Sequence, residues 1–451
     1  METNKLTESG VKSTLFRMAL PMLAGTIAMN AYNFADTWFV SKLGTLPLAA
    51  MGFSFPVVIF LTFIAGGIGT GVTAVTSSEL GRGDKNSASR IVTHGIIIIL
   101  FFSIILTIAG YLSIEPVFTK LGADKMTMPL ISDYMKTWYM GSAFMAIPFM
   151  GNGVLISLGD SKAASGFMVM GAAMNCILDP IMIFGWFGFP ALGIFGAALA
   201  TVIAQILSCM WLFYLLGVRY KLIRLKHLEF NLFKESFKQI MRFAIPGSIS
   251  MILMPISSAV ITKLISGYGR EAVAAAGAAS RVEMLAFVIP MALGMSLIPF
   301  VSQNYGAEKH IRIKKAKSYS TRFAFIYGAC ITGILFFAAP VIAGLFTADP
   351  KVSVVFILYI RIVSFGYGMM EIHRYSGFLM TGIHKPEYAT LINMFRVIIL
   401  LLPLSFAGNY FAGIKGIFAG RLITDLTAGA AGFVWITNML NSKLRNGLIK
   451  F

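Results

Sequence analysis

Charged residues are scarce in this chain of 451 residues. They make up 12% of it, whereas about one quarter is usual in a soluble domain. Because 57% of the residues are hydrophobic and the mean hydropathy is +0.79, the composition excludes a soluble fold and predicts a membrane protein in contact with lipid. The net charge is +18, but Lys and Arg cluster in short polar breaks between apolar runs, so nucleic-acid binding is not expected.

Cysteine is also rare. Cys176, Cys209 and Cys330 fall within apolar runs, which indicates small packing residues and neither disulfides nor metal ligands. The first ten residues lack the basic-then-apolar order of a cleaved signal peptide, so we expect the first apolar run to stay in the protein. Paired histidines, a nucleotide loop and a nucleophile motif are missing, so no enzyme activity or cofactor is expected, and a polytopic enzyme or receptor is a weak alternative.

Long apolar runs dominate what is present. Runs that can cross about 30 Å of hydrocarbon recur twelve times, and their length without alternating polarity excludes barrel strands. We therefore predict an all-α polytopic membrane protein with twelve transmembrane helices. The expected spans are 16–41, 47–77, 91–113, 132–158, 164–187, 191–217, 240–266, 272–303, 319–346, 352–381, 387–408 and 411–438.

Basic residues are concentrated in the breaks after spans two, six and eight. These breaks lie on the same side as both termini, and the odd-numbered breaks hold only one or two basic residues each. The positive-inside rule assigns the rich side to the cytoplasm. The sequence thus predicts a multi-pass protein of the inner (cytoplasmic) membrane with both termini cytoplasmic.

The chain repeats itself. A shift of 225 places Arg17 to Pro21 on Arg242 to Pro246, and a later shift of 223 places Gly193-Ile-Phe on Gly416-Ile-Phe. Each half holds six spans, so the halves have the same orientation, as in a parallel repeat. We predict an N-lobe at 1–217, a cytoplasmic inter-lobe linker at 218–239 and a C-lobe at 240–451. A chain that contains both lobes is expected to be a monomer.

Two carboxylates fall inside predicted spans. Asp36 lies about 28 Å and Asp179 about 24 Å from the cytoplasmic end of its helix, at 1.5 Å per residue. An ionised acid at a helix centre costs roughly 2.5–3.5 kcal/mol on insertion scales, so acids in such positions usually serve a function. We predict a cation or proton site in the outer half of the N-lobe.

Polar residues at similar depth complete this predicted site. Asn175 and Asp179 are i and i+4, on one helical face, and Pro180 frees a backbone carbonyl nearby. Thr201 and Tyr134 reach comparable depth on other spans. Such hard oxygen ligands suit Na⁺ or a shared proton. Ordinary interhelical hydrogen bonding is the alternative for each of these polar residues.

These motifs carry a resemblance that covers essentially the whole chain. Tyr32-Asn33-x-x-Asp36, Asn175-x-x-x-Asp179-Pro180, Gly-Ala-Ala-x-Ala-Thr ending at Thr201 and Leu-Gly-Asp-Ser-Lys at 158–162 resemble the multidrug and toxic compound extrusion (MATE) family. The resemblance implies a V-shaped antiporter that exports cationic, often aromatic drugs or toxic organic compounds against an inward flow of H⁺ or Na⁺.

The resemblance also implies roles for single residues. It assigns the coupling site to Asp36, Asn175, Asp179, Thr201 and Tyr134, with Na⁺ possible at the first four. Tyr32 and Asn33 lie beside this site. In the expected cycle, the cation binds, the first helix rearranges near Pro21, and the drug is released.

The second lobe does not duplicate this chemistry. The repeat mates of Asp36 and Asp179 are Ile261 and Leu402. Glu371 lies 14 residues before Lys385. In one branch of the family an acid has this spacing in span ten and a second acid lies in span seven, but this chain has no acid in span seven. Glu371 is thus either a possible C-lobe site residue or a structural partner of Arg374, three positions on.

A lipid-linked oligosaccharide flippase of the same architecture is an alternative. It would need a cationic cavity for phosphate groups, which Arg281, Arg361, Arg374 and Arg396 could supply. The Asp179-Pro180 motif argues against it. Arg281 and Glu283 do not share a helix face, and we expect them to have a structural role that braces the helices.

Overall fold

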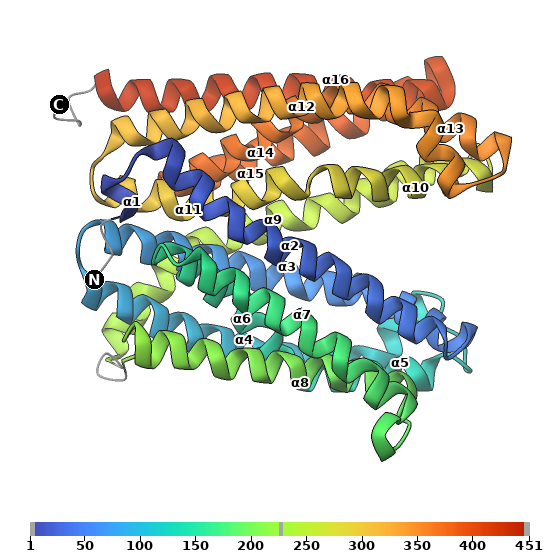
Figure 1. The fold of residues 1–451 in the computed structure, drawn as a ribbon, viewed down its shortest axis with the longest axis horizontal. Helices are drawn as coiled ribbons and strands as arrows, with labels where there is room; N and C mark the ends of the chain where they lie inside the picture. The colour runs from blue at the N-terminus through green and yellow to red at the C-terminus, as the bar shows by residue number, and fades with distance from the viewer. Residues whose placement is uncertain (1–4, 225–228, 446–451) are drawn as a thin grey trace. The chain divides into compact units, whose positions relative to one another are not determined.

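The computed structural model describes residues 5–224 and 229–445 and is almost entirely helical (Figure 1). The chain forms two compact units, one made of Arg17–Ser248 and the other of Leu6–Phe16 with the chain from Ile249 onward. The helices up to the middle of the chain are α1 (Lys5–Glu8), α2 (Val11–Ser41), α3 (Thr45–Gly81), α4 (Lys85–Lys120), α5 (Met128–Met140), α6 (Ser142–Ser157), α7 (Ser161–Phe184), η1 (Trp186–Gly188), α8 (Gly193–Phe213) and η2 (Tyr214–Arg219).

The rest of the chain repeats this pattern. Its helices are α9 (Phe230–Ser266), α10 (Arg270–Ala286), α11 (Val288–Gly306), α12 (His310–Phe346), α13 (Pro350–Val363), η4 (Ser364–Gly366), α14 (Tyr367–Gly382), α15 (Pro386–Met394), η5 (Phe395–Leu401) and α16 (Leu402–Arg445). Aspartate side chains cap the N-termini of three of these helices: Asp84 accepts from Ser87 N, Asp160 from Ala163 N and Asp349 from Lys351 N.

Helices long and apolar enough to cross a membrane are plentiful. Eight qualify alone, and the bent pairs α5–α6 and α10–α11 raise the number to ten. The last qualifying stretch, Pro386–Ser442, leaves helical geometry at Ala412 and Gly413, and Gly408 contacts Gly416 across this reversal, so it makes two crossings. With α2, whose polar residues lower its hydropathy, the described residues form the twelve predicted crossings.

The internal repeat is visible in the backbone. Helices that begin at Thr45, Lys85 and Ser161 have counterparts that begin at Arg270, His310 and Pro386, each displaced by the first shift of the sequence repeat. The left-handed residues before these helices repeat as well: Gly44, Gly83 and Gly159 recur as Gly269, Glu308 and His384. The two halves therefore share one fold, including the turns that separate its helices.

The first helix of each repeat is divided between the units. The start of α2, as far as Phe16, belongs to the second unit, where Phe16 packs edge-on to Phe323. The start of α9, as far as Ser248, belongs to the first, where Ser236 bonds His94 and Gly71 approaches the Ile240 carbonyl. Each unit thus holds helical turns from both halves of the sequence.

The predicted lobe and linker boundaries differ from these units. Because α9 begins at Phe230, the last part of the predicted linker 218–239 is helical. The apolar residues Phe233 and Phe237 recur at helical spacing there and explain the early start. Within the predicted N-lobe, linker and C-lobe, residues 1–4, 225–228 and 446–451 lie outside the described residues.

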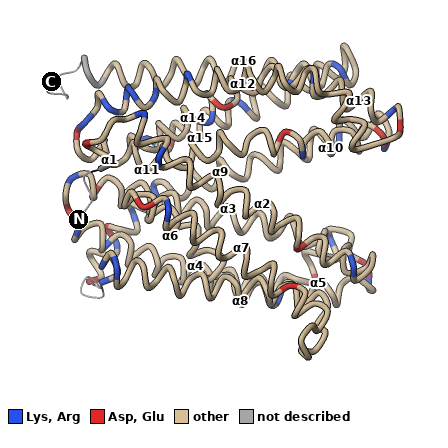
Figure 2. Tube along the Cα trace, in the orientation of Figure 1, with Lys and Arg blue, Asp and Glu red and all other residues tan. Residues whose placement is uncertain are grey.

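Charge in each unit is concentrated at the helix ends, and the middles of the helices are nearly free of it (Figure 2). The protein is a multi-pass membrane protein, and this distribution is typical of helices whose middles contact hydrocarbon. All three cysteines are free thiols: Cys209 is buried, Cys176 half-buried and Cys330 exposed.

Candidate functional site

The first unit buries both predicted carboxylates. Asp36 lies on α2 and is 7% exposed, and Asp179 lies on α7 and is fully buried. Their negative charges are close enough to interact, and both also interact with the phenols of Tyr32 and Tyr134. The structure therefore brings together two acids that are far apart in the sequence and lie on two different helices.

A short hydrogen-bonded chain links α7 to α8. With its amide oriented to satisfy both ends, Asn175 donates from Nδ2 to Asp179 Oδ2 at 2.9 Å, and its Oδ1 lies 3.0 Å from Thr201 Oγ1. Asn175 and Thr201 are 2% and 8% exposed. The predicted i, i+4 relation of Asn175 and Asp179 thus takes the form of a direct contact between the two side chains.

One oxygen of each acid has no hydrogen-bond partner. These oxygens are Asp36 Oδ1 and Asp179 Oδ1, both buried. Within residues 5–224 and 229–445, no Lys, Arg or His forms an ion pair with either acid. Buried carboxylates without a counter-charge are costly, and a proton or a metal cation is the simplest group that removes this cost.

The remaining predicted residues of this unit differ in their placement. Tyr134 on α5 is buried and Tyr32 on α2 is half-buried. Both phenols are close enough to the two acids to interact with them electrostatically. The Asn33 side chain is exposed, and its backbone carbonyl accepts from Thr37 Oγ1. Asn33 is therefore exposed, whereas Asp36 and Asp179, which we call the acid pair, are buried.

The two prolines lie inside continuous helices. Pro21 is within α2 and Pro180 within α7, next to Asp179. Because proline has no N–H, the carbonyl one turn earlier, that of Cys176 in α7, loses its helical donor. This carbonyl lies three residues before Asp179 on the same helix.

The possible C-lobe residues form an ion pair. Glu371 Oε1 lies 2.9 Å from Arg374 Nη1, one turn further along α14, and Arg374 stacks over the Phe287 ring. Glu371 is 1% exposed. The two charges thus lie together, but neither oxygen of Glu371 accepts a hydrogen bond.

Sequence reasoning missed a larger polar cluster in the second unit, which we call the arginine network: Glu283, Tyr359, Arg396, Arg421 and Asp425. Glu283 accepts from Tyr359 OH at 2.8 Å and from Arg421. Asp425 Oδ1 accepts from Arg396 Nη2 at 2.6 Å and Nε at 3.2 Å, while its Oδ2 lies 3.8 Å from Arg421 Nε. The sequence signal was the i, i+4 pair Arg421 and Asp425 inside a predicted span.

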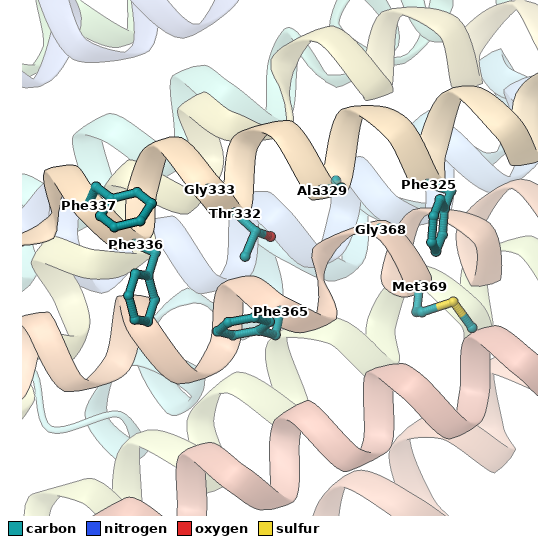
Figure 3. Close-up of a pocket in the computed structure, with 10 residues that line it drawn as sticks. Phe325, Ala329, Thr332, Gly333, Phe336, Phe337, Phe365, Gly368 and Met369 are labelled. Carbon is teal, nitrogen blue, oxygen red and sulfur yellow. The ribbon is translucent and has the colours of Figure 1, made fainter.

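The second unit also contains an apolar groove between α12 and α14, of about 520 Å³ (Figure 3). Its one hydroxyl, on Thr332, donates to the Ser364 carbonyl at 2.6 Å, so the groove offers no free polar group for an organic cation. The lining residues are Phe325, Gly328, Ala329, Thr332, Gly333, Phe336, Phe337, Phe365, Gly368 and Met369.

Comparison with known proteins finds matches that cover both halves of the chain. The profile of the MatE family matches residues 21–181 and again 246–407, so its two matches begin at Pro21 and Pro246, which the internal repeat also aligns. The FAD transporter of Shewanella oneidensis is 34% identical over 427 residues, 94% of each chain. The multidrug export protein MepA of Staphylococcus aureus is 24% identical over 97% of this chain and 96% of its own.

Among solved structures, the bent form of the Vibrio cholerae MATE transporter VcmN is similar over 98% of this chain and 99% of its own. Its TM-score is 0.92 and its sequence identity 28%. The similarity therefore extends over both units of the present chain.

Proposed function

The chain belongs to the MATE family and is a membrane transporter, not an enzyme, and we propose that it exports organic molecules in exchange for H⁺ or Na⁺. In this proposal the coupling ion enters from outside and binds at the acid pair, with Asn175, Thr201 and Tyr134 around it. Binding and release of the ion alternate with binding and release of the substrate, so that the transporter opens to one side at a time.

The observation that carries the proposal is the pair of buried acids without a basic partner. Neither Asp36 nor Asp179 has a basic partner among the described residues, and each keeps one oxygen without a hydrogen bond. Glu371 and Asp425 also keep such oxygens, but each lies beside an arginine. A proton shared by two neighbouring carboxylates, or a Na⁺ held by carboxylate, amide and hydroxyl oxygens, would remove both deficits. An ion bound there stabilises the conformation in which the site is intact, which is how it would drive the cycle.

Transport into everted membrane vesicles tests this assignment. We expect Asp36→Asn to abolish ion-driven uptake of a planar cationic dye, since the amide cannot take up a proton at neutral pH and binds Na⁺ less well. Asp133→Asn on α5 is the matched control, because it makes the same change at an exposed position. Undiminished coupled uptake by Asp36→Asn would remove this residue from the mechanism.

The same vesicles identify the coupling ion. Uptake is measured with a Na⁺ gradient after the proton gradient has been collapsed, and then with a proton gradient in Na⁺-free buffer. Whichever gradient supports uptake in the wild type should lose its effect in Asp36→Asn and keep it in Asp133→Asn.

For the substrate, we propose planar aromatic compounds, with cationic drugs as the first candidate. Acidic groups in an apolar surrounding favour cations, and a Staphylococcus aureus relative is named a multidrug export protein. A flavin dinucleotide is the second candidate, because the Shewanella oneidensis relative, with the higher identity, is named an FAD transporter. Competition between FAD and a cationic dye for the purified protein separates these two candidates.

The arginine contacts argue against the flippase alternative. Arg374 is paired with Glu371 and Arg396 with Asp425, so two of the four arginines that would bind phosphate already carry a counter-charge. Arg361 stacks on Phe336 and donates to its carbonyl. A polyprenyl-diphosphate ligand should therefore not compete with the dye in the same binding measurement.

A further inference from the structure

A second cavity, of about 670 Å³, lies in the second unit where the start of α2 packs beside the start of α12. We propose that it binds the headgroup of an anionic phospholipid. The residues that line it are Gly10, Val11, Lys12, Ser13, Phe16, Arg312, Lys315 and Tyr319.

The positive charge of this cavity has no acidic partner. Arg312 donates to Asn304 Oδ1 at 2.7 Å and to the carbonyls of Leu6 and Ser9 at 3.0 and 2.6 Å, all of which are neutral acceptors. Lys12 and Lys315 are exposed, and no carboxylate in the described part of the chain pairs with them or with Arg312. Three cations on one concave surface favour a phosphate group.

The position of the cavity selects a membrane lipid over a soluble anion. On α12 the basic stretch from His310 ends at Arg322, and the helix from Phe323 to Phe346 carries no charge, so the cavity lies near the expected boundary between water and hydrocarbon. Phe16 and Tyr319, which are 52% and 37% exposed, form its apolar edge. A headgroup can lie among the cations while an acyl chain follows these aromatic side chains.

Binding there would act on the helix that carries Asp36. Residues 11–16 are the beginning of α2. Arg312 donates to the Ser9 carbonyl just before this helix, and Phe16 packs against Phe323. A phosphate held between Lys12 of α2 and Lys315 of α12 adds a further link between the two helices.

The chain offers a matched control for this site. Lys314 and Lys317 lie on the same turns of α12 but bond to Asn441 and Thr437 of α16, at 2.8 and 2.6 Å. The double variants Lys12→Gln/Lys315→Gln and Lys314→Gln/Lys317→Gln therefore remove the same charge from different surfaces.

The experiment titrates the purified full-length protein in neutral detergent with phosphatidylglycerol, with phosphatidylcholine or with inorganic phosphate. It follows the melting temperature and, by native mass spectrometry, the retained lipid. We expect phosphatidylglycerol alone to bind and stabilise the wild type. Lys12→Gln/Lys315→Gln should weaken binding by about 25-fold, at about fivefold per basic residue near an anionic lipid. The control pair should change it little, and Lys12→Arg/Lys315→Arg should restore it.

Three results would overturn the proposal. Equal weakening in both glutamine pairs would show attraction to the overall surface charge. Equal stabilisation by phosphatidylcholine would show that the headgroup charge is not recognised. Equal stabilisation by inorganic phosphate would show a free-anion site. Transport is not part of the readout, so these results are independent of the proposed exchange mechanism.

Discussion

The two units bury acids in opposite ways. In the first, Asp36 and Asp179 have amide, hydroxyl and phenol neighbours and, among the described residues, no Lys, Arg or His partner. In the second, Glu283, Glu371 and Asp425 each lie against an arginine. One fold, used twice, thus buries one pair of acids without a basic partner and a second set of acids beside arginines.

One position links the two arrangements. Tyr134 and Tyr359 occupy the same place in the repeat, and both are buried. Tyr359 donates to Glu283, whereas Tyr134 is near Asp36 and Asp179. The scaffold therefore presents a phenol at the same place in both units, and the other side chains decide whether an arginine accompanies the acids.

The largest effect on coupled transport is expected for Asp179→Asn. Coupled transport should fall to background, because half of the acid pair is lost. The free energy of unfolding should stay the same or rise by up to about 2 kcal/mol, since the variant avoids the insertion cost of a buried charge. Vesicle uptake and thermal unfolding of the purified variant test this. A folded, fully active variant would contradict the assignment.

In the second unit, Asp425→Leu should lower the free energy of unfolding by about 3–5 kcal/mol, because Arg396 is left buried without its counter-charge. The double variant Arg396→Leu/Asp425→Leu removes both charges and should recover much of this loss. Loss of folded protein after heating measures both. If Asp425→Leu were as stable as Asp179→Asn, the distinction between the units would fail.

Tyr359→Phe should have a smaller effect, of about 1–3 kcal/mol, because Glu283 loses a donor and Arg421 loses a hydroxyl contact inside the network. Tyr134→Phe is the matched change in the first unit. It should alter transport more than stability, since no arginine depends on that phenol. Equal destabilisation by both changes would show that the two phenols have the same structural role.

Alkaline pH offers a test at the edge of the first unit. Burial, assisted by the hydrogen bond to Asp160, raises the pKa of Tyr220 to about 12 from its ordinary value of 10. The folded chain then holds a proton that the unfolded chain releases, so this residue lowers stability as pH rises from about 10 to 12. Melting curves across that range should fall less steeply for Tyr220→Phe. Parallel curves would contradict this account.

Much of the fold could be predicted from the sequence, because crossing lipid requires long apolar helices and because glycine and proline mark the repeat. The family match confirms the repeat at its predicted spacing, and the twelve crossings follow from the same runs. The break in α16, at Ala412 and Gly413, lies at the start of the predicted span 411–438 and not before it, since Gly413 permits the reversal there. The early start of α9 was missed because charged residues interrupt its apolar face.

The site was predictable only in part. Asn175 and Asp179 share a helix, so their spacing implied contact, whereas the position of Tyr134 depends on how α5 packs. The arginine network joins α10, α13, η5 and α16, and no local pattern says that Arg421 faces Glu283. Pairing across helices depends on tertiary packing, which single-sequence periodicity does not contain.

The smallest predicted effects concern the turns that the two halves share. Gly83, with φ 82°, and Glu308, with φ 58°, occupy the same place in the repeat. A side chain costs energy in this left-handed conformation, even at Gly83, where a Cβ atom would meet no neighbour. Gly83→Ala should therefore destabilise the folded protein, and Glu308→Gly stabilise it, by about 0.5–1 kcal/mol each after the entropy of the unfolded chain is included.

Glu308→Ala is the control, since it removes the carboxylate but keeps the strained backbone. Thermal unfolding of the three variants measures the effects. If Glu308→Ala stabilised as much as Glu308→Gly, the side-chain charge and not the backbone would distinguish the two turns.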